Sequence, residues 1–194
     1  DQLEQSEHEI ARRARTENDL SRFLPAEVAK AIANGERALT LGGQRRSVSV
    51  LFADVASFTP FAESSSPERA VEFLNELFSI VTAVVFRHGG TVDKYIGDCV
   101  MAIFGAPAEQ PEHCQRALLA AEAIHRFVAA AAPAWSETYG LRAALAIGVS
   151  SGEALVGNLG TEQRLEYTAI GDIVNVAARL EGVAQGGQTL VTSV

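Results

Sequence analysis

The sequence contains only two cysteines, Cys99 and Cys114, and this scarcity excludes a scaffold held together by disulfide bonds. Their spacing also fits no motif in which paired cysteines bind a metal. We therefore expect both residues to pack as free thiols, in a protein that works in a reducing compartment such as the cytoplasm.

Positive charge is also scarce. The chain has 16 Lys and Arg against 24 Asp and Glu, which gives a formal net charge of −8. Proteins that bind nucleic acid usually present clustered Lys and Arg to the phosphates. We therefore expect no nucleic-acid partner.

The sequence has no apolar run that approaches the roughly 18 residues of a membrane span. Its N-terminus shows neither a signal peptide nor an initiator Met. We expect a soluble piece of a longer protein that makes no membrane contact itself. It would be cytoplasmic, or the cytoplasmic part of a membrane-anchored protein.

Hydrophobic residues make up 47% of the chain, enough for one globular domain with a sizeable core. Residues 1–22 are charge-dense, lack Gly and Pro, and repeat apolar residues along one helical stripe. They predict a surface helix or, alternatively, a short coiled coil whose heptad is broken by Glu7 and Glu17. We interpret residues 1–45 as a signalling helix with a linker, and residues 46–194 as the main domain.

The main domain alternates strand and helix patterns. Turn residues punctuate it, with Pro67 at a helix start, Gly97-Asp98 in a tight hairpin, and Ser151-Gly152 in a second turn. The predicted elements are strand 47–55, a helix ending at 89–90, hairpin 91–105, helix 111–131, hairpin 141–160, strand 164–171, helix 172–184 and strand 188–193. This order contains the βαββαβ succession of a ferredoxin-like α+β sheet with helices on one face.

Two carboxylates lie at the ends of predicted strands. Asp54 closes the first strand, and Asp98 lies in the hairpin that this topology places beside it. Such a pair suits Mg²⁺ ions, because it offers hard oxygen ligands on rigid elements and leaves positions for water and phosphate. The alternative is that both are ordinary turn or strand-end carboxylates.

Asn175 and Arg179 are four residues apart in a predicted helix, so they share one face of it. Arg179 offers a planar fork for phosphate oxygens, and Asn175 offers an amide for a sugar. The alternative is a solvated pair near the end of the helix.

Three segments, taken together, resemble the class III nucleotidyl cyclase catalytic domain. They are VLFADVASFT at 50–59, DKYIGDCVMAIFG at 93–105 and YTAIGDIVNVAARLE at 167–181. The resemblance covers residues 46–194. The preceding stretches RFLPAEVAKAI and LGGQRR are similar to the lead-in of bacterial adenylate cyclases that carry Thr at one base-reading position.

The resemblance implies a catalytic site with two metal ions, Mg²⁺ or Mn²⁺. Asp54 and Asp98 match the two metal-binding aspartates of the family, and the backbone carbonyl of Val55 matches a further ligand. Asn175 matches the residue that positions the ribose. Arg179 matches the arginine that stabilises the transition state.

The resemblance also implies the base. Lys94 matches the lysine that donates to adenine N1, and Thr168 matches the residue that accepts from the N6 amine. Members that form cyclic GMP usually carry Glu and Cys, or a similar residue, at these positions. The implied function is an adenylate cyclase that converts ATP into 3′,5′-cyclic AMP and pyrophosphate. The alternatives are a guanylate cyclase and a catalytically silent module that dimerises or binds nucleotide.

Finally, the resemblance implies a head-to-tail homodimer with shared active sites. One chain would supply the aspartates and its partner the base readers, the Asn and the Arg. An upstream sensor domain would act through residues 1–22. The family's catalytic domain continues past the equivalent of Val194, so we expect residues 46–194 to be C-terminally incomplete.

Overall fold

A computed structural model of the chain describes residues 10–12, 14–15, 29, 34, 41–161 and 163–192. The predicted signalling helix and the linker therefore fall largely outside the described residues.

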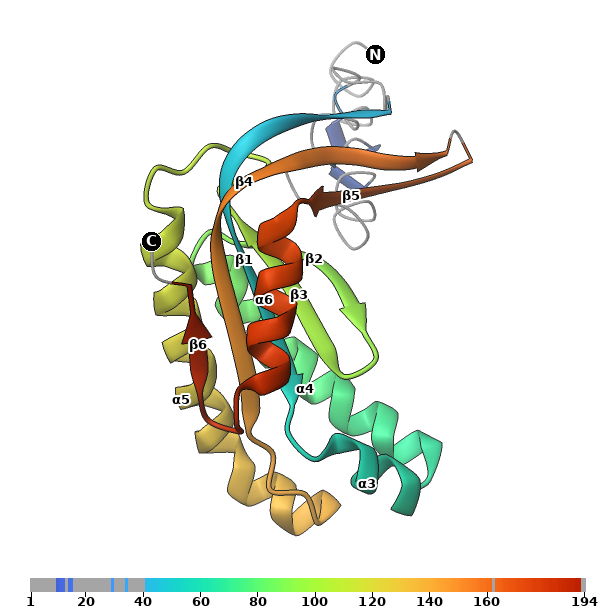
Figure 1. The fold of residues 1–194 in the computed structure, drawn as a ribbon. Helices are drawn as coiled ribbons and strands as arrows, with labels where there is room; N and C mark the ends of the chain where they lie inside the picture. The colour runs from blue at the N-terminus through green and yellow to red at the C-terminus, as the bar shows by residue number, and fades with distance from the viewer. Residues whose placement is uncertain are drawn as a thin grey trace.

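One mixed sheet forms the centre of the molecule, with its strands in the order β2-β3-β1-β4-β5 (Figure 1). These five strands pair antiparallel, while β6 pairs parallel with β4. The fold class predicted from the sequence, an α+β sheet with helices, is confirmed. The strands are β1 (Gly42–Val55), β2 (Thr91–Ile96), β3 (Cys99–Phe104), β4 (Leu145–Thr161), β5 (Arg164–Ile170) and β6 (Thr189–Val191).

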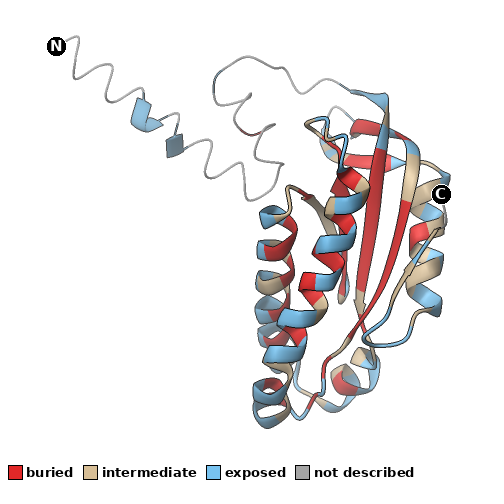
Figure 2. Cartoon of the chain, turned by 90° about the vertical axis from the view of Figure 1, so that its left-hand side faces the viewer, coloured by how far each residue is buried: buried red, intermediate tan, exposed pale blue. Residues whose placement is uncertain are grey.

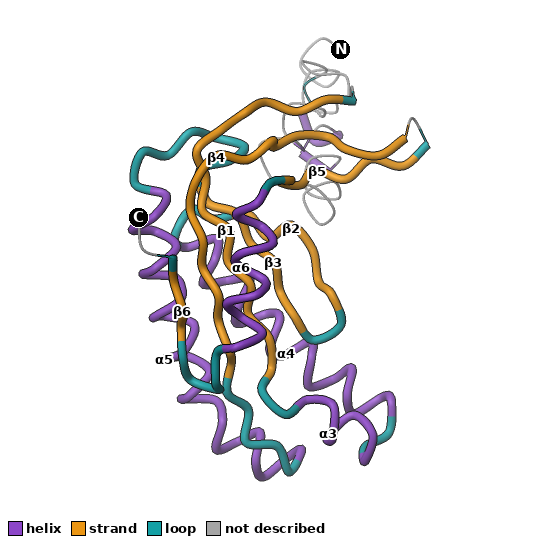
Figure 3. Tube along the Cα trace, in the orientation of Figure 1, coloured by secondary structure: helices purple, strands orange, loops and turns teal. Residues whose placement is uncertain are grey.

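Helices cover both faces of the sheet (Figures 1 and 3). The helices are α3 (Phe58–Ser64), α4 (Pro67–Arg87), α5 (His113–Tyr139) and α6 (Asp172–Val183). The two long helices, α4 and α5, lie on one face, as expected. The shorter α6 lies on the other face, which differs from the expectation that all helices share one side.

The alternation of β1 explains this arrangement. Leu51 and Ala53 pack in the cluster that includes α4 and α5, whereas Val50 and Phe52 pack in the cluster that includes Ala177 of α6. A strand that is apolar on both faces must be covered on both sides. Figure 2 shows the buried residues gathered along the strands and on the sides of the helices that face them.

The hairpin predicted at Ser151-Gly152 is wrong. Strand β4 continues through both residues, and they pair with Ser49 and Val48 of β1. The chain turns only after Thr161, before β5 begins. Strand β1 starts at Gly42, inside the stretch predicted as linker, so it is long enough to pair with β4 in one register from Leu145 to Asn158.

Other predicted boundaries agree more closely with the structure. The turn between β2 and β3 lies at Gly97, whose φ of 64° is a left-handed conformation that glycine adopts without strain. Helix α4 begins at Pro67, and the side chain of Ser66 accepts from the Arg69 amide. Cys99 and Cys114 are both free thiols, as predicted.

Helix α5 is longer than predicted and runs to Tyr139 through Pro133. Its last turns are anchored on α4, since Trp135 and Tyr139 each donate a hydrogen bond of 2.7 Å to Glu76. Within the described part of the chain, α5 is the single helix whose length and composition would allow it to cross a membrane. Its buried side chains pack in the core beneath the sheet.

Candidate functional site

Two of the three predicted metal ligands, Asp54 and Asp98, meet at one end of the sheet, and the third, Val55, follows Asp54 as the last residue of β1. Strand β1 pairs with β3 up to Ala53 and Val100, so Asp54 comes level with Cys99 and next to the turn residue Asp98, whose carboxylate interacts with it. Burial raises the pKa of Asp54 from 3.8 to about 7, and the negative charges of Asp98 and Glu181 add to this rise. A hydrogen bond from the backbone amide of Val55 to the Asp54 carboxylate lowers this pKa and so offsets part of the rise.

Glu181 is a third acid at this end of the sheet that the sequence analysis missed. Burial and the charge of Asp98 raise the pKa of Glu181. It comes four residues after Ala177, which is completely buried against the sheet, so the helical period places both on the same side of α6. That spacing is the signal that could have identified it.

The approach of α6 to the sheet is close. A Cβ atom on Gly148 of β4 would lie 2.1 Å from the carbonyl oxygen of Ala177 and 2.3 Å from the amide nitrogen of Glu181. Only glycine leaves room for the helix backbone at this point. Gly148 therefore determines how near the acidic residue of α6 comes to the carboxylates of the sheet.

Asp54 and Asp98 suit a divalent cation. Both are hard oxygen donors on rigid elements. Burial, together with the negative charges of Asp98 and Glu181, raises the pKa of Asp54 to about 7, and a bound cation would favour the ionised carboxylate. Among the described residues, no three His, Cys, Asp or Glu side chains form a metal-binding group. A cation on these two carboxylates would therefore complete its coordination with other oxygen ligands.

The two predicted base readers line a different part of the molecule. Lys94 of β2 and Thr168 of β5 face a cavity of about 630 Å³. Its walls are largely apolar, and neither Asp54 nor Asp98 contributes to them. The apolar lining residues are Phe52, Ile96, Met101, Leu159, Ala169, Ile170 and Val174.

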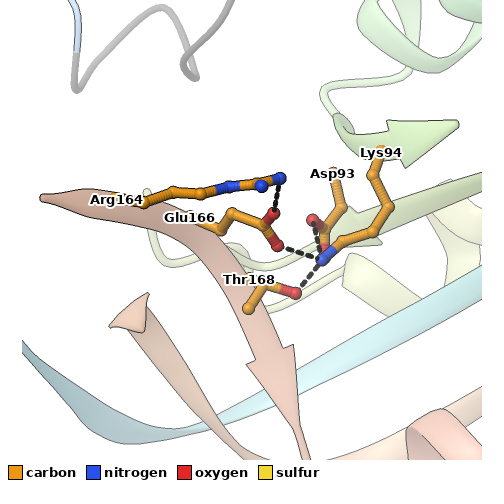
Figure 4. A network of polar contacts seen from close by, with 5 residues as sticks. All are labelled: Asp93, Lys94, Arg164, Glu166 and Thr168. Atoms are coloured by element: carbon orange, nitrogen blue, oxygen red, sulfur yellow. Dashed lines mark hydrogen bonds and ion pairs between the residues drawn. The ribbon is translucent and has the colours of Figure 1, made fainter. Parts of the chain in front are cut away.

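Charged residues connect the two base readers (Figure 4). The Lys94 ammonium donates to Glu166 across 2.7 Å and lies 3.6 Å from Asp93. The Thr168 hydroxyl donates to the other carboxylate oxygen of Asp93. Burial alone would lower the pKa of Lys94, but the hydrogen bond to Glu166 and the charge of Asp93 outweigh it and raise the pKa, so Lys94 stays cationic.

Asp93 and Glu166 were also missed by the sequence analysis. Glu166 comes two residues before Thr168 in a strand, so the alternation of β5 could have identified it. Asp93 precedes Lys94 directly, and alternation would place the two side chains on opposite faces. The register of β2 on β3 shifts between Val92 and Lys94, however, and this bulge turns Asp93 toward Thr168 (Figure 4).

Asn175 and Arg179 lie on the exposed side of α6. They do not line the cavity of Lys94 and Thr168. Within the described residues, neither side chain forms a hydrogen bond or an ion pair. The structure thus brings together the two aspartates, and separately the two base readers, while the Asn and Arg remain open to a ligand.

The family model, the similar sequences with a named activity and the similar solved structures all point to one protein family. The model of the Adenylate and Guanylate cyclase catalytic domain matches residues 43–194. Adenylate cyclase 1 of Rhizobium meliloti (strain 1021) is 37% identical over 169 residues, which are 83% of this chain and 24% of that protein. An uncharacterized protein of Mycobacterium tuberculosis is 39% identical over 88% of this chain and 30% of its own. The chain thus spans less than a third of the length of these relatives.

Solved structures include cyclases of both base specificities. The adenylyl cyclase CyaB from P. aeruginosa is 31% identical with a TM-score of 0.75, covering 78% of this chain and 79% of that one. A guanylyl cyclase is 33% identical with a TM-score of 0.74, covering 78% and 77%.

The pKa of Asp54 predicts how stability depends on pH in the metal-free chain. Folding raises this pKa from 3.8 to about 7, so the folded chain holds a proton that the unfolded chain releases. The contribution of Asp54 to the free energy of unfolding should therefore be largest at low pH and be lost as the pH rises through this window. In Asp54→Asn this loss should be absent.

Urea denaturation in the presence of EDTA, at one pH below the window and one above it, measures this difference. The Asn variant should gain stability relative to the natural chain at the higher pH. Glu153→Gln, at an exposed carboxylate on β4, is the control and should show no such gain. A difference between Asp54→Asn and the natural chain that does not change with pH would contradict the expectation.

Proposed function

The chain belongs to the adenylate and guanylate cyclase catalytic domain family, and from that premise we propose that it converts ATP into 3′,5′-cyclic AMP and pyrophosphate. The observation that carries the proposal is the pair of Lys94 and Thr168 in one cavity. Adenine presents an acceptor at N1 and a donor at N6. Lys94 supplies the donor, and the Thr168 oxygen supplies the acceptor.

Guanine reverses this pattern, because its N1–H is a donor and its O6 an acceptor. A guanylate cyclase is nevertheless the second candidate, since Glu166 places an acceptor 2.7 Å from Lys94 in the same cavity. A catalytically silent module that binds nucleotide is the third, and it would carry the same cavity without turnover.

The proposed reaction is an internal phosphoryl transfer in which the ribose 3′-hydroxyl attacks the α-phosphorus and pyrophosphate leaves. Asp54, Asp98 and the Val55 carbonyl would hold two Mg²⁺ or Mn²⁺ ions. When bound, these ions lower the pKa of the attacking hydroxyl and neutralise the triphosphate. Asn175 would orient the ribose, and the guanidinium of Arg179 would stabilise the charge that gathers on the α-phosphate oxygens.

We further propose that the active site is shared between two chains of a head-to-tail homodimer. In one chain the aspartates and the base readers do not line a common cavity, and Asn175 and Arg179 face outward. The rim of the cavity also exposes apolar side chains, Ile96 and Ile170, of which 52% and 59% are accessible. A partner chain would cover this rim and bring its two aspartates to the nucleotide.

Incubation with ATP or GTP in the presence of Mg²⁺ or Mn²⁺, followed by mass spectrometry, tests the function. Cyclic AMP should form from ATP, with much less cyclic GMP from GTP, and Asp54→Ala should abolish both. We propose that the catalytic domain continues past residue 194, so a longer chain is assayed in parallel. Absence of cyclic nucleotide from both chains would refute the enzyme proposal.

Mixing two inactive variants tests the shared site. Asp54→Ala and Arg179→Ala each damage both sites of their own homodimer, but a mixed dimer keeps one site intact. Random pairing should restore about a quarter of the natural turnover, because half of the dimers are mixed and each has one working site. A mixture that contains heterodimers by native mass spectrometry but stays inactive would argue against sharing.

We also propose that residues 1–45 carry a signal from an upstream sensor domain to a cytoplasmic catalytic domain, residues 46–194. The motivation is the weak apolar stripe that precedes the domain. Changing Leu3, Ile10 and Leu20 to Ser in the full-length protein should alter the response of turnover to its signal. An unchanged response would remove this role.

A further inference from the structure

Asp93 is an unusual residue to find directly behind a cavity wall, where it contacts the lining residues Lys94 and Thr168. Its side chain is only 1% exposed, although it is a carboxylate. One oxygen accepts from Thr168, while the other, Oδ1, has no hydrogen-bond partner. The Lys94 ammonium lies 3.6 Å from Oδ1 and offsets part of the cost of burying this charge. The acceptor without a hydrogen bond still carries a cost that a neutral residue would avoid.

The backbone is also adapted to place this carboxylate. Tyr95 lies on the α4 side of β2, where it stacks on Phe78 with ring centroids 4.3 Å apart and shares a hydrogen bond with Thr82. Regular alternation would put Asp93 on that same side. The bulge between Val92 and Lys94 directs Asp93 to the other side, toward Thr168.

The consequence concerns the direction of one hydrogen bond. Burial raises the pKa of Asp93, whereas the Thr168 hydroxyl and the Lys94 ammonium favour its ionised form. An ionised carboxylate can only accept, so the Thr168 hydroxyl donates its single proton to Asp93. The lone pairs of the Thr168 oxygen are then what remains for a ligand in the cavity. Without Asp93, the hydroxyl could rotate and act as either donor or acceptor.

We propose that Asp93 is a positioning residue that determines base specificity, by fixing Thr168 as an acceptor toward the nucleotide. An acceptor matches the exocyclic amine of adenine and opposes the carbonyl oxygen of guanine. Asp93 also places a negative charge 3.6 Å from the Lys94 ammonium, which keeps Lys94 a donor. The inference rests on the proposed function and deepens it, since it assigns the choice of base to a residue that need not touch the base.

The variant Asp93→Asn tests this assignment, because it keeps the shape of the side chain but adds an amide that can donate to the Thr168 oxygen. The readout is the ratio of kcat/KM for ATP to kcat/KM for GTP. We expect this ratio to fall by about tenfold, the effect of one hydrogen bond. A merely structural role would lower turnover with both nucleotides and leave the ratio unchanged.

Two further variants separate the effect from general damage. In a Thr168→Val background there is no hydroxyl to orient, so adding Asp93→Asn should not change the ratio further. Glu153→Gln removes an exposed carboxylate from β4, at the position that pairs with Ser47 of β1. This variant should leave the ratio as in the natural chain. An equal change from Asp93→Asn in both backgrounds would overturn the assignment.

Calorimetry measures the dissociation constants for ATP and GTP, and their ratio reports base selectivity without turnover. If the natural chain makes cyclic nucleotide but Asp93→Asn keeps its base ratio, the inference fails and the proposed function stands. If the chain binds ATP selectively without turnover, and Asp93→Asn removes the selectivity, the enzyme proposal fails and the role of Asp93 stands. A natural chain that binds neither nucleotide would refute both.

Discussion

Repulsion between two carboxylates is the constraint on which the rest of the site depends. The antiparallel register of β1 on β3 brings Asp54 beside Asp98 whatever their charges, because that register is held by buried pairs such as Phe52 with Met101 and Ala53 with Val100. Apolar burial on both faces of the sheet thus offsets the cost of the acidic end. Burial, with the charges of Asp98 and Glu181 added to it, raises the pKa of Asp54 to about 7, and this rise is the part of the cost that the chain alone does not relieve. A site of this kind is complementary to a cation.

The acidic end and the cavity that holds Lys94 and Thr168 are different parts of the chain, since neither Asp54 nor Asp98 lines that cavity. Each chain therefore presents two incomplete halves, one suited to metal ions and one to a base. Helix α6 adds Asn175 and Arg179 on its exposed side, without partners among the described residues. Two copies related by a twofold axis would combine the halves, which is why the proposed chemistry requires a dimer.

Much of this arrangement could be predicted from local patterns. Gly97-Asp98 identified the hairpin because only a small set of residues accepts its backbone conformation, and Pro67 identified the start of α4. The turn at Ser151-Gly152 was predicted wrongly, because the signal is local, whereas the long partner strand β1 that keeps β4 extended is not. Asp93 could not have been identified by alternation, since a bulge reverses its direction. Glu181 could have been, from its spacing to the buried Ala177.

The most direct test of the account is the pKa of Asp54 itself, followed by ¹³C NMR of the carboxyl carbon and assigned with Asp54→Asn. In EDTA the carboxyl should titrate near 7, far above the ordinary 3.8. Addition of Mg²⁺ should lower this pKa strongly, because a bound cation favours the ionised carboxylate. A pKa that is already near 4 without metal, or one that Mg²⁺ does not move, would contradict the claim that these two carboxylates form a divalent cation site.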